Sequence, residues 1–236
     1  MKSVIIIPAL NEEDAIGGVV AGVRDQVDRV IVVDNGSTDQ TAERAAEAGA
    51  EVVYVAKPGY GRACLAGVAV ASDCDLLIFM DGDGADDPTD LPDLIAPVLR
   101  GEADLVIGSR ALGRTEIGAL TLPQRWGNAL ATCLMRWFWN GPFTDLGPFR
   151  AIRRTSYQRL AMQAPTFGWT VEMQVRALKQ NLRCTEVPVA YRRRIGVSKI
   201  SGTLKGVIVA GAFILGTIFR EAVQPASTVE APRKAR

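Results

Sequence analysis

The first half of the chain alternates continuous apolar runs with stretches of helical composition. Runs rich in valine, isoleucine and leucine predict strands at residues 3–8, 29–34, 51–56, 76–81 and 103–109. The intervening segments predict helices at residues 12–27, 41–49, 63–72 and 90–101. Strands that are apolar at every position are covered on both faces, and strands that alternate with helices form a mostly parallel sheet. The pattern therefore predicts a doubly wound α/β domain with helices on both faces of the sheet.

The second half is less regular. It predicts helices at 122–139 and 169–180, a loop at 144–154 leading to a short strand, and a strand at 183–194. An uncharged apolar run at 206–219 predicts a C-terminal helix over 203–220. As a helix this run is about 21 Å long, which is shorter than the roughly 30 Å hydrocarbon core of a bilayer. We therefore expect no transmembrane span, and both a buried helix and a membrane-surface helix stay open.

Polar clusters follow four of the predicted strands, with the sequences PALNEE, DNGSTD, KPGYGR and DGDGADD. Because the carboxyl ends of parallel strands meet at one edge of a sheet, we expect all four clusters to share that edge. Asp81 and Asp83 are two residues apart at a strand end and project to the same side. Two such carboxylates repel each other unless a cation lies between them, and Mg²⁺ or Mn²⁺ is typical. The alternative is a solvated acidic loop in which Asp87 and Asp90 cap helices.

The segment VVDNGSTDQT combines a strand end, a turn and a predicted helix start. Ser37 and Gln40 have the spacing of a capping box, which is a purely structural explanation. That explanation leaves out Asp34, which ends a buried strand at the predicted ligand edge. Its carboxylate would suit hydrogen bonding to the ribose or base of a nucleotide.

Charge is divided unevenly along the chain. Residues 1–108 carry 7 Lys+Arg and 20 Asp+Glu, net −13, whereas residues 109–236 carry 20 and 6, net +14. An acidic half that binds a cation and a basic half that binds phosphates would fit this division, as would two halves that neutralise each other. The chain has no histidine, which excludes His-based general bases, Ser-His-Asp triads and the usual zinc sites. Four cysteines without a C-x-x-C pair, and no secretory signal, predict reduced thiols in the cytoplasm.

The motifs PALNEE, VVDNGSTDQT, DGDGADDP, GSR and TDLGPFRAI occur here in an order that resembles family 2 glycosyltransferases with the GT-A (Rossmann-like) fold. The segment SKISGT and the overall size are most similar to polyprenyl-phosphate (dolichyl-phosphate-type) sugar synthases. The resemblance covers residues 3–205. It implies an inverting, metal-dependent transfer of a sugar from a UDP- or GDP-linked donor to a polyprenyl phosphate.

The resemblance also implies roles for individual residues. It assigns the nucleotide-sugar site to Pro8, Ala9, Leu10, Glu12, Asp34, Arg62, Asp81, Gly82 and Asp83. It assigns the Mg²⁺ or Mn²⁺ ion to Asp81 and Asp83, with Ala85 where the synthases commonly have a metal-binding glutamine, so that Asp86 or water would complete the shell. It assigns phosphate binding to Arg110, Arg125, Arg194 and Lys199, and catalysis to Asp83, Asp145 and Arg125. For Arg192 and Arg193 a solvated charge run and substrate contact both stay open.

We expect one domain over residues 1–220, with a nucleotide-sugar-binding half at 1–109, an acceptor-binding half at 110–220 and a disordered basic tail at 221–236. The expected partners are a nucleotide-diphosphate sugar and polyprenyl phosphate or another acceptor, with no nucleic acid. Peripheral contact with the cytoplasmic face of the membrane is compatible with the basic half and the apolar run. Three alternatives stay open. They are a soluble glycosyltransferase that uses Asp145 as a base toward a hydroxyl acceptor, a nucleotidyltransferase, and a non-catalytic nucleotide-binding protein.

Overall fold

The computed structural model describes residues 1–196 and 204–224, and the side chains of the second range from residue 209 onward. Its strands are β1 (Ser3–Ala9), β2 (Arg29–Asp34), β3 (Glu51–Tyr54), β4 (Leu76–Phe79), β5 (Leu105–Ser109), β6 (Arg150–Arg153) and β7 (Cys184–Pro188). Its helices are α1 (Ile16–Val23), α2 (Thr41–Glu47), α3 (Tyr60–Val70), α4 (Leu91–Leu99), α5 (Leu122–Trp139), α6 (Arg154–Leu160), α7 (Trp169–Lys179) and α8 (Leu204–Val223). A short 3₁₀ turn, η1 (Pro88–Asp90), precedes α4.

The strands form one sheet in the order β3-β2-β1-β4-β6-β5-β7. Strands β1 to β4 pair in parallel, as do β5 and β7, whereas β6 lies antiparallel between β4 and β5. All four residues of β4 are fully buried, which explains the continuous apolar run. The mostly parallel α/β sheet predicted from the sequence is therefore confirmed.

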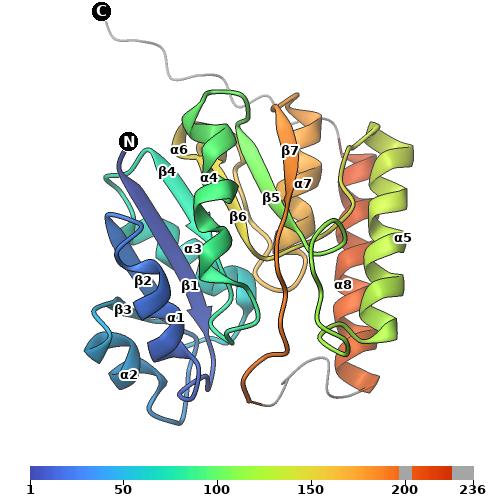
Figure 1. Ribbon diagram of the computed structural model, residues 1–236. Coiled ribbons are helices and arrows are strands. Elements are labelled where there is room, and N and C mark those ends of the chain that lie inside the picture. Colours follow the sequence, from blue (N-terminus) through green and yellow to red (C-terminus); the bar gives the residue numbers. More distant parts are fainter. Residues whose placement is uncertain (197–203, 225–236) are drawn as a thin grey trace, which may run out of the picture.

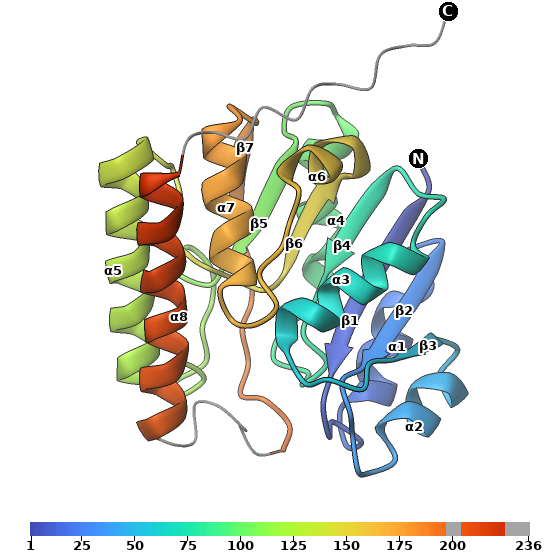
Figure 2. The same ribbon diagram turned by 180° about the vertical axis from the view of Figure 1, so that it is seen from behind.

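Helices cover both faces of the sheet (Figures 1 and 2). One apolar core joins the sheet to α1, α2 and α4. The other core joins the opposite face to α3, α6 and α7 and also takes in the inner side of α5. Helices α5 and α8 run side by side beyond α7 and form the outer wall at that end of the molecule.

Two capping predictions are wrong. Helix α2 begins at Thr41 without a side-chain cap, because Ser37 has another partner: its Oγ accepts from the backbone N–H of Asn11 at 2.9 Å. This bond joins the loop after β1 to the loop after β2. Asp90 does not cap α4 but accepts from the backbone N–H of Ala190 at 2.6 Å. The prediction for Asp87 is confirmed, since its Oδ1 accepts from Thr89 N–H at the start of η1.

Several element boundaries also differ from expectation. Helix α1 begins at Ile16 and ends at Val23, so it is shorter than the predicted 12–27, and β7 ends at Pro188 instead of residue 194. Helix α8 continues to Val223, three residues beyond the expected helix end at residue 220. The side chain of Glu221 is buried and ion-paired to α7. Among the described helices, none is both long enough and apolar enough to cross a membrane.

Candidate active site

The loops after β1, β2, β3 and β4 meet at one edge of the sheet around a cavity of about 370 Å³. Seven of the residues predicted for nucleotide-sugar binding line it, namely Pro8, Ala9, Leu10, Glu12, Asp81, Gly82 and Asp83. They come from segments up to 75 positions apart in the chain, and parallel strand ends bring them together. We call this cavity the donor pocket.

The other two predicted nucleotide residues do not line the donor pocket. Asp34 is buried, and its Oδ1 accepts from the backbone N–H of Ser37 at 2.8 Å. Arg62 donates from Nη1 to the carbonyl oxygen of Pro58 at 2.5 Å and so holds the adjoining loop. The pocket wall includes the neighbour of Asp34 instead: Asn35 lines the cavity, and its Oδ1 accepts from Gly59 N–H at 3.1 Å.

Sequence reasoning missed several lining residues. Tyr60 lies within the third polar cluster, KPGYGR, so the polar pattern could have identified it. Thr166 and Phe167 come from the loop before α7, which carries no motif. This loop reaches the pocket because the backbone of α3 at Gly61 packs against it. A Cβ at Gly61 would lie 2.0 Å from the carbonyl oxygen of Ala164.

The floor of the donor pocket is acidic. Asp83 is buried; its Oδ1 accepts from Ala85 N–H at 2.9 Å, and its Oδ2 is ion-paired with Arg194. Burial, reinforced by the charge of Asp83, raises the pKa of Asp81 to about 7. Burial also raises the pKa of Asp86 well above its usual range, and the neighbouring Asp81 and Asp83 add to this effect. Nearby arginines offset only part of the rise in these two pKa values.

A divalent cation fits this arrangement. Asp81 Oδ1 and Asp86 Oδ1 are buried without a hydrogen-bond partner in the described part of the chain. Within that same part, no group of three or more His, Cys, Asp or Glu side chains is arranged to hold a metal ion. Two carboxylates with free oxygens suit Mg²⁺ or Mn²⁺ when substrate phosphates and water supply the remaining ligands.

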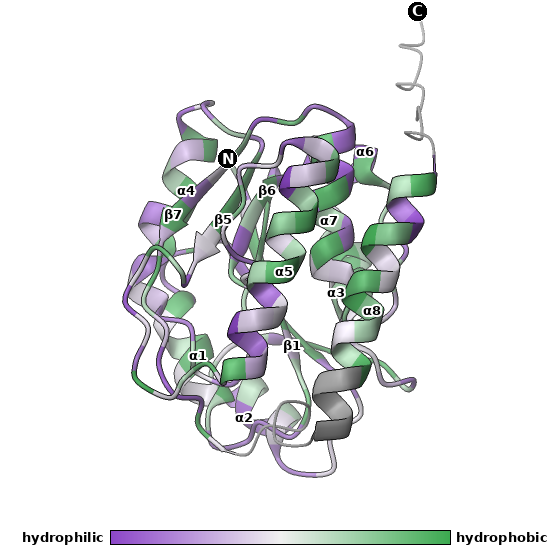
Figure 3. Cartoon of the chain, turned by 90° about the vertical axis from the view of Figure 1, so that its right-hand side faces the viewer, coloured by the Kyte–Doolittle hydropathy of each residue, from purple (hydrophilic) through white to green (hydrophobic). Residues whose placement is uncertain are grey.

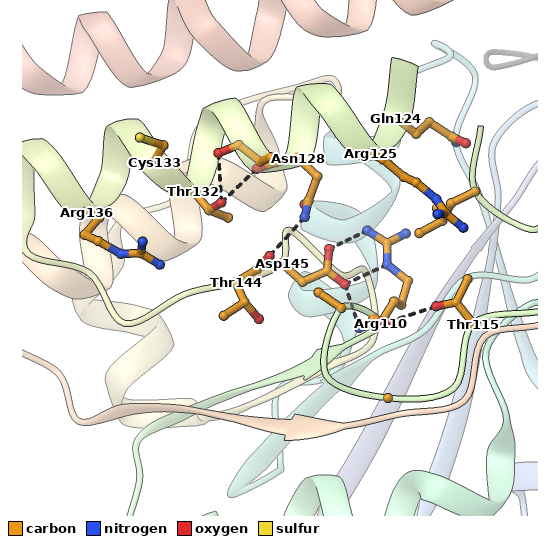
Figure 4. Close-up of a pocket in the computed structure, with 14 residues that line it drawn as sticks. Arg110, Thr115, Gln124, Arg125, Asn128, Thr132, Cys133, Arg136, Thr144 and Asp145 are labelled. Atoms are coloured by element: carbon orange, nitrogen blue, oxygen red, sulfur yellow. Dashed lines mark hydrogen bonds and ion pairs between the residues drawn. The ribbon is translucent and has the colours of Figure 1, made fainter. Parts of the chain in front are cut away.

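A second constellation lies beside α5 and is built on an ion pair (Figure 4). The carboxylate of Asp145 accepts from Arg110 three times, from the backbone N–H at 2.7 Å, from Nε at 2.8 Å and from Nη2 at 2.7 Å. Both side chains are largely buried, and the Arg110 guanidinium carbon lies 5.0 Å from the ring centre of Tyr191. Burial would lower the pKa of Arg110, but the pairing with Asp145 outweighs it and raises that pKa, so Arg110 remains a fixed cation.

The loop that carries Asp145 is held from several sides. The amide of Asn128 on α5 donates to Thr144 O at 3.0 Å and accepts from Leu146 N–H at 2.8 Å. The loop also approaches the end of β5 so closely that a Cβ at Gly147 would lie 2.3 Å from the carbonyl oxygen of Gly108. This contact aligns Asp145 with the GSR segment that contains Arg110.

Arg150, on β6, also holds the loop that carries Asp145. Its buried guanidinium donates from Nε to the carbonyl oxygen of Gly147 at 3.1 Å and from Nη1 to that of Thr170 at 2.9 Å. Burial lowers the pKa of Arg150 to about 10. The loop is therefore fixed before any ligand binds.

The Arg110–Asp145 pair borders an open cavity of about 620 Å³, the basic groove. Helix α5 lines it with Arg125, Asn128, Thr132 and Arg136, which recur on one side of the helix (Figure 4). Arg125 and Arg136 are exposed, and neither forms an ion pair within the described ranges 1–196 and 209–224. The groove therefore offers three guanidiniums, of which only Arg110 is already neutralised.

A third cavity of about 270 Å³ connects the two sites. It shares Tyr60, Asp81 and Arg194 with the donor pocket. It also shares Arg110 and Asn128 with the basic groove. A ligand in the groove would therefore reach a donor bound above the acidic floor.

The identity of the family follows from comparison with known proteins. Residues 4–161 match Glycosyl transferase family 2. The chain is a family 2 glycosyltransferase. An uncharacterised glycosyltransferase of Mycobacterium tuberculosis is 38% identical over 87% of this chain and 93% of its own length. An undecaprenyl-phosphate mannosyltransferase of Micrococcus luteus is 31% identical over 87% of this chain and 90% of its own length.

The fold of this glycosyltransferase also has a solved counterpart. Glucosyl-3-phosphoglycerate synthase of Mycobacterium tuberculosis, solved with Mn²⁺, UDP and phosphoglyceric acid, superposes with a TM-score of 0.75 at 24% identity. The superposition covers 96% of this chain and 80% of the other. The predicted GT-A fold is therefore confirmed.

The basic segment of the glycosyltransferase after β7 is only partly described. Arg194 lies between the donor pocket and the connecting cavity, paired with Asp83. Arg192 pairs with Asp87 and Arg193 with Glu116, so both are engaged in the fold itself. Lys199, a predicted phosphate-binding residue, lies outside the described residues.

Proposed function

We propose that this glycosyltransferase transfers a sugar from a UDP- or GDP-linked donor to a polyprenyl phosphate, with inversion at the anomeric carbon. The observation that carries the proposal is the continuity between the acidic floor of the donor pocket and the basic groove. In this scheme residues 1–109 bind the nucleotide sugar and residues 110–220 bind the acceptor.

On the donor side, the backbone and side chains of the β1 loop would enclose the nucleoside, with Asn35 at its edge. Asp81 and Asp83 would hold Mg²⁺ or Mn²⁺ together with the diphosphate, with the free Oδ1 of Asp86 beside them. The bound ion would neutralise charge on the departing nucleoside diphosphate. Arg194 pairs with Asp83 and lines both the donor pocket and the connecting cavity, so it would exchange Asp83 for a diphosphate oxygen when the donor binds.

On the acceptor side, the chemistry favours a phosphate nucleophile. A phosphate oxygen is already anionic, so it needs cations to hold it and no general base. Arg125 and Arg136 from α5 and Arg110 from the end of β5 would supply those cations around the basic groove. The role of the groove would then be to align the phosphate oxygen with the anomeric carbon and to screen charge.

The geometry of Asp145 supports this choice over the hydroxyl alternative. A general base needs a free lone pair directed at the proton that it removes. Both carboxylate oxygens of Asp145 instead accept from Arg110, and the side chain is 1% exposed. Asp145 is therefore suited to positioning Arg110.

Two similar proteins support an acceptor that carries a phosphate, one with a lipid phosphate and the other with a small phosphorylated acid. The Micrococcus luteus relative is an undecaprenyl-phosphate mannosyltransferase, and the structural counterpart was solved with phosphoglyceric acid. The structure with phosphoglyceric acid favours another candidate function, which is transfer of the sugar to a hydroxyl of a small phosphorylated molecule. In that reaction the basic groove would bind the phosphate while the hydroxyl is the nucleophile.

A panel of acceptors separates these candidates. Purified protein would be incubated with UDP- and GDP-sugars, Mg²⁺ or Mn²⁺, and either a short water-soluble prenyl phosphate, the matching prenol or 3-phosphoglycerate. We expect nucleoside diphosphate release that depends on the prenyl phosphate and is absent with the prenol. Release with 3-phosphoglycerate alone would contradict the polyprenyl proposal and support the small-molecule one.

A further inference from the structure

Exposed large apolar side chains are concentrated on two adjacent helices. Of the sixteen such side chains in the described residues, nine lie on α5 and α8. On α5 they are Leu122, Trp126, Leu130, Trp137 and Phe138, and on α8 they are Val209, Phe213, Phe219 and Val223. Isolated exposed apolar residues are normal, but a contiguous group marks an interaction site.

The group on α5 forms a stripe. Leu122, Trp126, Leu130 and Trp137 are four or seven residues apart, so they lie on one side of the helix. Trp126 is 76% exposed and Trp137 is 78% exposed. Neither lines the donor pocket, the connecting cavity or the basic groove. Their exposure is therefore unexplained by the active site.

Aromatic contacts join this stripe to α8. The rings of Trp137 and Phe138 lie 5.0 Å apart, and Phe138 meets Phe219 of α8 edge-on at 6.3 Å. Figure 3 views α5 and α8 from outside and shows hydrophobic residues along both helices. The exposed apolar side chains of the two helices thus meet on the outer wall, and we call the nine side chains together the apolar face.

We propose that the apolar face docks on the surface of a lipid membrane that contains anionic lipids. The inference extends the proposed function, because it would place the basic groove beside the bilayer, but membrane docking is measured without any substrate. The residue types and the charges around the apolar face favour a membrane as the binding partner.

The charges bordering the apolar face are positive. Arg125 directly precedes Trp126 and Arg136 directly precedes Trp137, so each tryptophan is about 100° around the helix from a guanidinium. Helix α5 contains no acidic residue. On α8, Arg220 is exposed, and the two carboxylates that it pairs with, Glu172 and Glu221, are buried. Basic residues beside an apolar helix face complement anionic lipid headgroups.

The same charges disfavour a second copy of the chain as the occupant. In a symmetric dimer the same patch is present on both partners, so the arginines of one copy would approach those of the other. Tryptophan, in contrast, is suited to the boundary between hydrocarbon and water, since its indole has an apolar body and a polar N–H. A bilayer surface satisfies both features of the apolar face.

Vesicle binding tests the proposal directly. The full chain and the double variant Trp126→Ala/Trp137→Ala would be titrated with vesicles of phosphatidylcholine and phosphatidylglycerol, and bound protein measured by flotation. We expect the double variant to bind at least about tenfold more weakly, because two indoles leave the bilayer surface. Tyr54→Ala and Ile117→Ala, which remove exposed side chains elsewhere, serve as matched controls and should bind like wild type. Thermal unfolding of every variant checks that the fold is kept, and Trp126→Gln provides a second, milder test.

Two results would overturn the proposal. One is wild-type protein that does not float with these vesicles, or that floats no better than the double variant. The other is a wild-type dimer in sedimentation that the double variant converts to monomer, with vesicle binding unchanged, which would assign the apolar face to a protein contact.

A further measurement separates membrane docking from the proposed function. With a short water-soluble prenyl phosphate, transfer by the double variant should stay within about twofold of wild type, since neither tryptophan lines the site. Vesicle binding that persists while no prenyl phosphate is used would leave the docking intact and reject the polyprenyl acceptor.

Discussion

Asp83 combines two interactions that a single substitution can separate. Its Oδ1 accepts from Ala85 N–H and shapes the loop, whereas its Oδ2 and its charge face Arg194 and the proposed metal position. Asp83→Asn keeps an oxygen for the loop and removes the charge. We expect transfer to fall about 10³-fold, a loss typical of removing charge stabilisation in an active site. Nucleoside diphosphate release measures it.

The fold should survive this change, because the buried hydrogen bond to the loop is retained. Asp73→Asn, at an exposed carboxylate paired with Lys2, is the matched control and should leave transfer unchanged. Full wild-type transfer in excess EDTA would contradict a metal role for Asp83.

The pair Arg110–Asp145 allows a second prediction, which distinguishes a positioning role of Asp145 from a general-base role. If Asp145 positions Arg110, Asp145→Asn should lower kcat/KM by about 10-fold to 100-fold, equivalent to one charged hydrogen bond. The shape of the pH–rate profile should not change. If Asp145 were the general base, its replacement would remove the acidic limb of that profile. Arg110→Ala should raise the KM for the acceptor and leave the KM for the donor within about twofold.

At the scale of elements, the continuous apolar runs were sufficient to predict the strands in the parallel part of the sheet. Strands β1, β2 and β4 and helix α5 lie where the sequence predicts them, within a few residues. The position of β6 was not predictable, because its antiparallel insertion between β4 and β5 depends on tertiary pairing of only four residues. Helix α6 was missed because it is short and carries no apolar period.

The candidate site likewise contains residues that the sequence predicted and residues that it did not. Residues that follow strands in sequence, such as Asp81 and Glu12, were found because strand ends converge. Phe167 was missed, since only the packing of α3 against the loop before α7 brings it to the donor pocket. The pairing of Asp145 with Arg110 joins residues 35 positions apart and follows from no local pattern.

Helix α8 offers an element-scale prediction, because one buried carboxylate holds it on α7. Glu221 accepts from Arg176 Nε at 3.1 Å and from Lys179 Nζ at 2.9 Å. Glu221→Gln leaves Lys179 without a counter-charge and leaves Arg176 with Glu172 alone, so we expect the free energy of unfolding to fall by about 3 kcal/mol. Urea denaturation at pH 7 measures it, and Glu102→Gln, in an exposed pair with Arg100, is the matched control.

This stabilisation should depend on pH in a defined direction. Burial would raise the pKa of Glu221, but Lys179 and Arg176 outweigh it and lower that pKa. A lowered folded-state pKa means that the stabilisation is present above the unfolded value, about 4.3, and is lost as the pH falls through the folded value. The difference between wild type and Glu221→Gln should therefore shrink in acid, and a difference that stays constant to pH 3 would contradict it.

At the scale of the whole molecule, both explanations of the divided charge are supported. Some cations of the basic half neutralise the acidic half directly: Arg183 pairs with Asp104, Arg192 with Asp87 and Arg194 with Asp83. Others remain for ligands, since Arg125 and Arg136 face the basic groove. The two proposed substrate sites thus differ in how far their charges are exposed to solvent.

That difference predicts unequal sensitivity to salt. Raising NaCl from 0.1 M to 1 M shortens the Debye length from about 10 Å to about 3 Å, and exposed charges are screened far more than buried ones. The KM for a prenyl phosphate should therefore rise about tenfold, because Arg125 and Arg136 are exposed. The KM for the nucleotide sugar should change less than about threefold, because Asp83 is buried. The double variant Arg125→Gln/Arg136→Gln should have a high acceptor KM with little salt dependence. A donor KM that rises more steeply than the acceptor KM would contradict the assignment of the groove to the acceptor phosphate.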